Sequence, residues 1–323
     1  MRQFRRVLGW LFFLGGLLAG IVAALVAFFT RYLVNPPRQP LWATPADLGM
    51  AFEAVQFPAR DGVRLSGWFV PGAQTKLQSG ATIMLVHGWP WNRLGEAAED
   101  MLSNISGATP VDLLRLAYGL HQDGFHIFMF DLRNHGQSAA APPVTFGQQE
   151  MRDVLGALDY LGLRPDVDNS RIGAIGFSMG ANALLFALAE TEAIKAAVVV
   201  QPTSPAVFSK GYARDLLGPL SAVVLPLVDW IYKLWGGMRL EEIRPSSATA
   251  QAKDTPILFI QGDGDRWGSV SDVAQIAAAA PNPSGPLIAK TADRFGGYQY
   301  VVDNPRVATA FLEQHFSTIL PKV

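Results

Sequence analysis

The N-terminal segment contains a run of 24 residues without a charged side chain, from Val7 to Thr30. Arginines precede the run, and Arg31 follows it directly. As a helix, such a run rises about 36 Å, which is enough to cross a hydrocarbon core of about 30 Å. The sequence therefore predicts a membrane-spanning anchor over residues 1–34, with its contact to the lipid bilayer through residues 7–30.

Two other interpretations of this run stay open, a cleaved secretory signal and a buried helix of a soluble protein. A secretory signal usually has an apolar core of about 7–15 residues that ends in a small-x-small cleavage site. This run is longer and leads into the bulky Phe28, Phe29 and Tyr32. The excess of arginines before the run predicts, by the positive-inside rule, a single-pass protein with a cytoplasmic N-terminus and an exported domain.

The composition excludes several other classes of protein. Half of the residues are apolar (50%) and only 16% are charged, against roughly 25% in ordinary soluble domains. The chain is therefore not intrinsically disordered, and since it has no cysteine it is neither a disulfide scaffold nor a zinc-thiolate protein. The net charge of −1 favours no nucleic-acid partner. No cofactor and no metal site are predicted.

After the anchor, residues 35–49 form a proline-rich linker that we expect to be extended, because proline fixes φ and disfavours helix in the preceding residue. Residues 50–323 form the globular domain. An antiparallel pair of strands is predicted over residues 53–71, around an Asp61-Gly62 turn. Short apolar runs predict buried parallel strands at residues 81–86, 126–130, 171–177, 196–200, 256–260 and 286–290.

Helical patterns separate these strands. Apolar residues recur at helical spacing over residues 111–122, 148–161 and 179–190, and the last helix is expected from Asn304 to about residue 319. Strands that alternate with helices in this way predict an α/β fold, with a mostly parallel sheet covered on both faces.

A Gly-x-Ser-x-Gly pentapeptide, residues 176–180, lies directly between a predicted strand and a predicted helix. Its glycines allow a tight strand-to-helix turn that exposes the hydroxyl group of Ser178 at the head of the helix. Upstream, the strand 81–86 ends in a turn, residues 87–90, from which a backbone N–H could join that of Met179 to hold a developing oxyanion.

Together with the stretch 131–138 and the Gly262-Asp263-Gly264-Asp265 turn, these motifs resemble the α/β-hydrolase family, in the family's order and over essentially residues 50–320. The resemblance implies that Ser178 is the nucleophile, that the amides of Trp89 and Met179 form the oxyanion hole, and that Asp265 is the acid of the triad. Asp265 is preferred to Asp263 because the family pattern is Gly-x-x-Asp. The fold implied is an α/β-hydrolase fold with a helical cap insertion and an N-terminal transmembrane helix.

The third member of the triad is missing from the expected place. The resemblance implies a histidine in the loop before the last helix, but Phe295 occupies that position and no histidine lies between Asp265 and His315. A phenyl ring cannot accept the serine proton, so ordinary acylation loses its general base. His315 could substitute only if the start of the last helix rearranged.

A long insertion is predicted to form the cap, over about residues 203–250. Within it, residues 216–235 are nearly long and apolar enough to span a membrane. A span here would leave Ser178 and Asp265 on opposite sides of the bilayer, so we expect a pair of cap helices that either line an apolar acyl pocket or rest on the membrane surface. A cap that packs on the core without a ligand is the alternative.

The sequence thus leads to a membrane-anchored serine hydrolase with an incomplete Ser-His-Asp triad and impaired turnover. Its predicted substrate is an ester, thioester or amide with an apolar acyl part. The alternative is a catalytically inactive protein of the same fold that binds an apolar ligand or acts as a scaffold.

Overall fold

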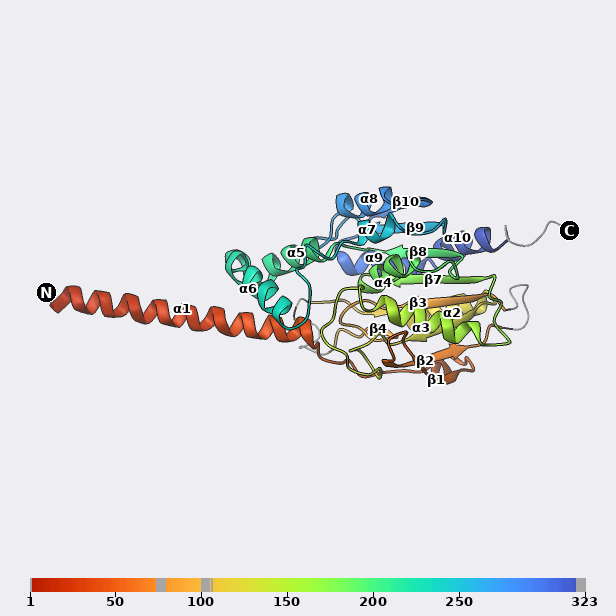
Figure 1. The fold of residues 1–323 in the computed structure, drawn as a ribbon, viewed down its shortest axis with the longest axis horizontal. Helices are drawn as coiled ribbons and strands as arrows, with labels where there is room; N and C mark the ends of the chain where they lie inside the picture. The colour runs from red at the N-terminus through yellow and green to blue at the C-terminus, as the bar shows by residue number, and fades with distance from the viewer. Residues whose placement is uncertain (1, 74–79, 100–104, 106, 318–323) are drawn as a thin grey trace.

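A computed structural model describes residues 2–73, 80–99, 105 and 107–317 of the chain. Its centre is an eight-stranded sheet in the order β1-β2-β6-β3-β7-β8-β9-β10 (Figure 1). The strands are β1 (Glu53–Pro58), β2 (Arg64–Val70), β3 (Thr82–Val86), β6 (His126–Phe130), β7 (Ile172–Phe177), β8 (Ala196–Val200), β9 (Ile257–Gly262) and β10 (Pro283–Ala289).

The predicted strand pattern is confirmed. β1 and β2 pair antiparallel around the Asp61-Gly62 turn, and β2 also runs antiparallel to β6. All other neighbours in the sheet are parallel. The carboxyl ends of the parallel strands therefore meet at one edge of the sheet, where their following loops converge.

Helices cover both faces of the sheet (Figure 1). They are α2 (Leu113–Gln122), α3 (Met151–Gly162), α4 (Met179–Leu188), α8 (Val270–Ala278), α9 (Arg294–Asp303) and α10 (Arg306–Ser317). Alternate strand residues point to opposite faces, so Val198 of β8 belongs to one apolar core and Val199 to the other. Each core closes against its own set of helices, α3, α4 and α8 on one side and α2, α9 and α10 on the other.

One predicted helix begins later than expected. Residues 111–122 were expected to be helical throughout, but Val111–Asp112 forms strand β5, which pairs with β4 (Gly95–Glu96). The carboxylate of Asp112 then accepts a hydrogen bond from the amide of Arg115, so α2 begins at Leu113 with Asp112 as its N-cap.

The N-terminal helix α1 (Arg2–Val34) extends away from the sheet (Figure 1). Among the described residues, two helical segments are long and apolar enough to cross a bilayer, Gln3–Val34 and Pro205–Leu234. The second is not one straight helix, because Gly218–Leu220 forms a turn (η2) between α5 (Pro205–Leu217) and α6 (Ser221–Leu234), and these two helices pack on each other. The expected cap thus folds as a helix pair, followed by the short α7 (Pro245–Thr249).

The linker after α1 is bound to the domain. Arg38 donates hydrogen bonds to the carbonyl oxygens of Gly136 and Ser138, and the Gln39 side chain donates to Glu96. A 3₁₀ turn, η1 (Pro45–Leu48), follows before β1. These contacts hold the linker after α1 against the domain.

Two buried histidines lead to a prediction on pH. Burial lowers the pKa of His87 from its ordinary 6.5 to about 4 and that of His135 to about 3. Between pH 6.5 and 4 the unfolded chain therefore binds protons that the folded chain does not bind. The free energy of unfolding should fall as the pH falls through this window, by about 1.4 kcal/mol per pH unit for each histidine at most.

Urea unfolding of the full chain in detergent at several pH values measures this slope. His135→Gln keeps a donor for the carbonyl oxygen of Arg133, which the His135 Nδ1 contacts at 2.8 Å, and it removes one titrating group. The variant should show a shallower slope; an unchanged slope would contradict the assignment to His135.

Candidate active site

Ser178 lies at the turn between β7 and α4, as the pentapeptide predicts. Its φ of 50° is in the left-handed region, which is strained for a residue other than glycine. A methyl group on Gly180 would overlap the carbonyl oxygens of Val86 and His87, so glycine is needed there for α4 to approach β3. The strained turn and the close approach give the geometry of a nucleophile elbow.

The turn after β3 lies beside Ser178. A Cβ atom on Gly88 would meet the Cβ atom of Ser178 at 3.3 Å, so the backbone before Trp89 is adjacent to the serine. Met179 is the first residue of α4, and its N–H therefore has no acceptor within the helix. The two segments predicted to form the oxyanion hole are thus next to each other, and the roles of their amides stay a prediction.

Asp265 lies at the same edge, in the turn after β9. Its Oδ1 accepts hydrogen bonds from the amides of Trp267 (3.0 Å) and Gly268 (2.9 Å). The other candidate, Asp263, accepts instead from the amide of Thr291 at 2.8 Å. Only Asp265 of the two is therefore in a position to contact the group next to the serine.

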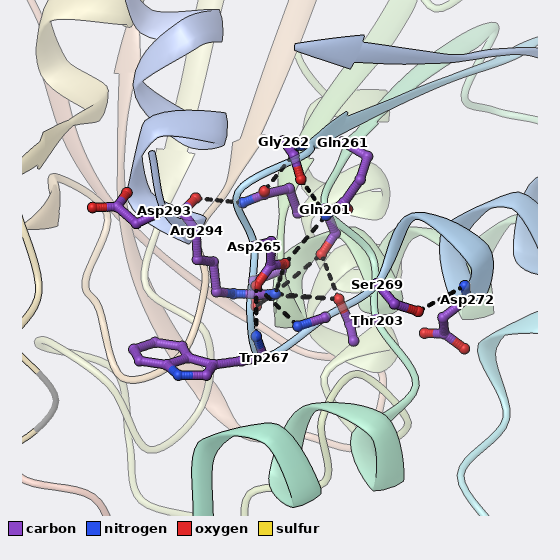
Figure 2. Close-up of polar contacts among 12 residues, drawn as sticks. Gln201, Thr203, Gln261, Gly262, Asp265, Trp267, Ser269, Asp272, Asp293 and Arg294 are labelled. Carbon is purple, nitrogen blue, oxygen red and sulfur yellow. Dashed lines mark hydrogen bonds and ion pairs between the residues drawn. The ribbon is translucent and has the colours of Figure 1, made fainter. Parts of the chain in front are cut away.

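That group is the guanidinium of Arg294, which Figure 2 shows beside Asp265. Its Nη1 donates to Oδ2 of Asp265 in a short ion pair, and its Nη2 donates to Oγ of Ser178 at 3.0 Å. The side chain is buried, with 4% of the residue exposed. Arginine thus bridges the serine and the acid, which is the place of the histidine in a Ser-His-Asp triad.

This geometry corrects the position assigned to the missing base. Phe295 was expected there, but its ring packs edge-on against Trp267 and Tyr298. The residue that points between Ser178 and Asp265 is the one before it. The reason is local: the carboxylate of Asp293 accepts a hydrogen bond from the amide of Gly296, so that α9 begins at Arg294 and directs this side chain inward.

Sequence reasoning also missed Tyr298 and Gln201. Tyr298 is fully buried one helical turn after Arg294, and its hydroxyl interacts with Arg294 and Ser178. Gln201, at the end of β8, donates to the carbonyl oxygen of Arg294 at 2.7 Å. The sequence did contain a signal for Tyr298. An N-cap at Asp293 would begin a helix there, and Arg294 and Tyr298 would then lie on one face of that helix. Gln201 carried no comparable signal.

The protonation states of these groups limit the chemistry. Burial alone would lower the pKa of Arg294, but the charge of Asp265 and the interactions with Tyr298 together outweigh it and hold the pKa above its ordinary value. Burial raises the pKa of Tyr298, although Arg294 partly opposes this effect. Arg294 is therefore a cation and Tyr298 a neutral phenol at neutral pH. Neither can act as the general base that a histidine provides.

Ser178 opens into a small cavity of about 30 Å³. Its walls are mainly aromatic and include Tyr32 of α1, Trp89, Phe208 and Tyr212 of α5, and Phe295. In the described part of the chain, no histidine hydrogen-bonds to Ser178 or Asp265, and no group of three or more acidic or histidine side chains could hold a metal ion.

Comparisons with known proteins agree with this architecture. A family model described as the α/β-hydrolase fold matches residues 81–217. The uncharacterized protein YfhR of Salmonella typhi is 30% identical over 175 residues, which is 52% of this chain and 51% of that protein. The chain thus spans about half the length of the YfhR proteins that it matches.

Two further relatives cover more of the chain. The α/β-hydrolase domain-containing protein WAV2 of Arabidopsis thaliana is 27% identical over 287 residues, 83% of this chain and 82% of that protein. The structure of the esterase Pf2001 of Pyrococcus furiosus superposes with a TM-score of 0.67 at 24% identity and covers 88% of this chain and 100% of that one. The topology, the elbow at Ser178 and these similarities together show that the chain has the α/β-hydrolase fold.

Proposed function

We propose that this protein is a membrane-anchored serine hydrolase of low turnover that acts on an ester, thioester or amide with an apolar acyl part. One observation carries the proposal: Ser178 lies on a strained elbow, in an aromatic cavity, and is hydrogen-bonded to a cation that is itself paired with Asp265. The esterase similarity of the fold supports the reaction class, and the apolar walls support the acyl part.

In the proposed reaction, Oγ of Ser178 attacks the acyl carbon. A bond forms between Oγ and that carbon, and the bond to the leaving group breaks. Arg294 donates to Oγ and has no lone pair to offer, so the serine proton passes to water, and the leaving group takes a proton from water. A water molecule then attacks the acyl carbon, the bond to Oγ breaks, Oγ takes up one proton of that water, and the acid is released. In serine hydrolases that lack a triad member, roughly 10³–10⁴-fold catalysis over water remains. The expected turnover is correspondingly slow.

A second candidate function is ligand binding without turnover. The hydrogen bond from Arg294 to Oγ of Ser178 favours this alternative, because the guanidinium occupies a lone pair that Oγ would use for attack. Under this alternative, Arg294 and the predicted oxyanion amides would hold the polar end of an apolar ligand.

Labelling by a fluorophosphonate distinguishes the two functions. We expect the full chain in membranes to be labelled slowly, and Ser178→Ala to be unlabelled, because the probe reacts only with a serine that can attack. The labelled band should stay with the membranes after an alkaline carbonate wash, as a spanning helix requires. Absence of labelling in natively folded protein would favour the binding function, and release by carbonate would contradict the anchor.

A further inference from the structure

A second cavity, of about 40 Å³, lies between α1, α5 and α6. Four residues line both this cavity and the one at Ser178, namely Tyr32, Trp89, Phe208 and Tyr212. Most of the remaining lining is aliphatic, and it includes Leu33, Leu217, Val224 and Val228. The two cavities thus share an aromatic wall, and the second one offers an apolar extension beside the first.

Trp89 on this shared wall has an unused donor. Its indole nitrogen is buried and has no hydrogen-bond partner in the described part of the chain. A buried donor without a partner is unfavourable, because it has lost its bond to water. An ester or carboxyl oxygen bound beside Trp89 would supply the missing acceptor, which fits a ligand with a polar head at Ser178 and an apolar tail.

The cavity lies where the apolar surfaces of α1 and α6 meet. Val26 of α1 packs against Val224 and Val228 of α6, so that the two helices lie side by side at the end of α1 (Figure 1). The outer face of α6 is apolar and exposed, with Val223, Leu227, Trp230 and Leu234, and the exposed Trp235 follows the helix directly. A bilayer that holds α1 would also cover this adjoining face. Tryptophan side chains are typical of the interfacial region between lipid and water. The exposed tryptophan of α6 therefore suits a position of this helix at the membrane surface.

The size of the cavity sets how an acyl chain could fit. A cavity needs a volume of about 10–15 Å³ to hold one water-sized group. The cavity of about 40 Å³ therefore holds only a few carbon atoms. A longer chain has to continue past the half-buried rim, which α1, α5 and α6 provide through Phe29, Leu217 and Leu225. That rim borders the apolar faces that the bilayer would cover.

We propose that α1 is one wall of an acyl-binding site as well as an anchor, and that the substrate is a long-chain acyl ester resident in the bilayer. Its carbonyl group lies at Ser178, its first carbons fill the cavity between α1, α5 and α6, and the rest of the chain extends past the rim into the lipid. This inference rests on the proposed function for the position of the carbonyl group, for the ester class of the substrate and for the anchoring of α1.

Two neighbouring residues of α6 provide a matched test. Val224 lines the cavity and is 1% exposed, whereas Val223 faces outward and is 52% exposed. In nanodiscs, Val224→Phe should lower the labelling rate of Ser178 by a dodecyl fluorophosphonate by about tenfold and leave labelling by diisopropyl fluorophosphate unchanged. Val223→Phe should change neither rate. Ala213→Phe, which enters the cavity from α5, repeats the test if Val224→Phe does not fold.

An equal loss with both probes, or no loss with the dodecyl probe, would overturn the inference. If neither probe labels Ser178, the proposed function has failed, and a dodecyl ether that carries a photoreactive diazirine then tests the inference alone. In Ser178→Ala protein it should cross-link to Tyr212 and Ala213, and Val224→Phe should abolish these cross-links. Their absence, or their persistence in Val224→Phe, would contradict the acyl site itself.

Discussion

Replacing Arg294 with histidine is expected to accelerate the acylation of Ser178 by roughly 10²–10⁴-fold, the usual contribution of a general base. Arg294 already lies between Oγ of Ser178 and the carboxylate of Asp265. An imidazole from the same position of α9 can accept the serine proton and return it to the leaving group. Asp265, held by two backbone amides, would orient the ring and stabilise its charged form.

The measurement is the second-order rate of fluorophosphonate labelling, together with hydrolysis of an aryl ester. Arg294→Gln is the first control, because it removes the guanidinium without adding a base. Phe295→His is the matched positional control: its side chain would point toward Trp267 and should bring no gain. If Arg294→His folds with the native thermal stability and reacts no faster than Arg294→Gln, the bridging position does not act as the base position.

Asp131→Ala is expected to destabilise the fold by about 3–5 kcal/mol, because it leaves the buried charge of Arg93 without its partner. Both side chains of this ion pair are almost fully buried, with 1% and 0% exposed. Oδ1 of Asp131 accepts from the amide of Arg93 at 2.8 Å, and Oδ2 accepts from its Nη2 at 2.6 Å and from the amide of Gln137 at 2.7 Å. The substitution therefore also leaves the buried backbone donor of Arg93 and the part-buried one of Gln137 without this acceptor.

Urea unfolding of the full chain measures this loss. The matched control is Asp159→Ala, which breaks an ion pair with Arg60 whose side chains are 56% and 43% exposed. An exposed pair contributes at most about 1 kcal/mol, because water and salt screen it. If the two variants lost similar amounts, burial would not govern the strength of the Arg93–Asp131 pair.

Much of the fold could be predicted from local patterns. Apolar runs such as residues 126–130 and 196–200 became β6 and β8 with the same bounds. The predicted and observed bounds agree because a strand that is buried on both faces needs apolar residues throughout. The end of the apolar run therefore marks the end of the strand. Predictions failed where a long-range contact decided the structure. Pairing with β4 turned residues 111–112, which were expected to be helical, into a strand.

The candidate site divides in the same way. The place of Ser178 follows from the boundary between a strand and a helix, and Asp265 was preferred to Asp263 through the family resemblance, in a loop that begins where β9 ends. Arg294 could not be placed in this manner. Its long side chain reaches several ångströms from its own backbone, so its target depends on where α9 packs and on which charge lies nearby.

The sequence by itself determined an apolar N-terminal helix, an alternation of strands and helices, a serine on a tight glycine-flanked turn, and the absence of a histidine near residue 295. Each of these follows from residues that are neighbours in the chain. Only the tertiary structure decided that an arginine bridges the serine and the acid, and that the end of α1 lines the cavity beside them. These two features depend on side chains from distant segments, and the requirement to pair a buried charge and to cover an apolar surface brings them together.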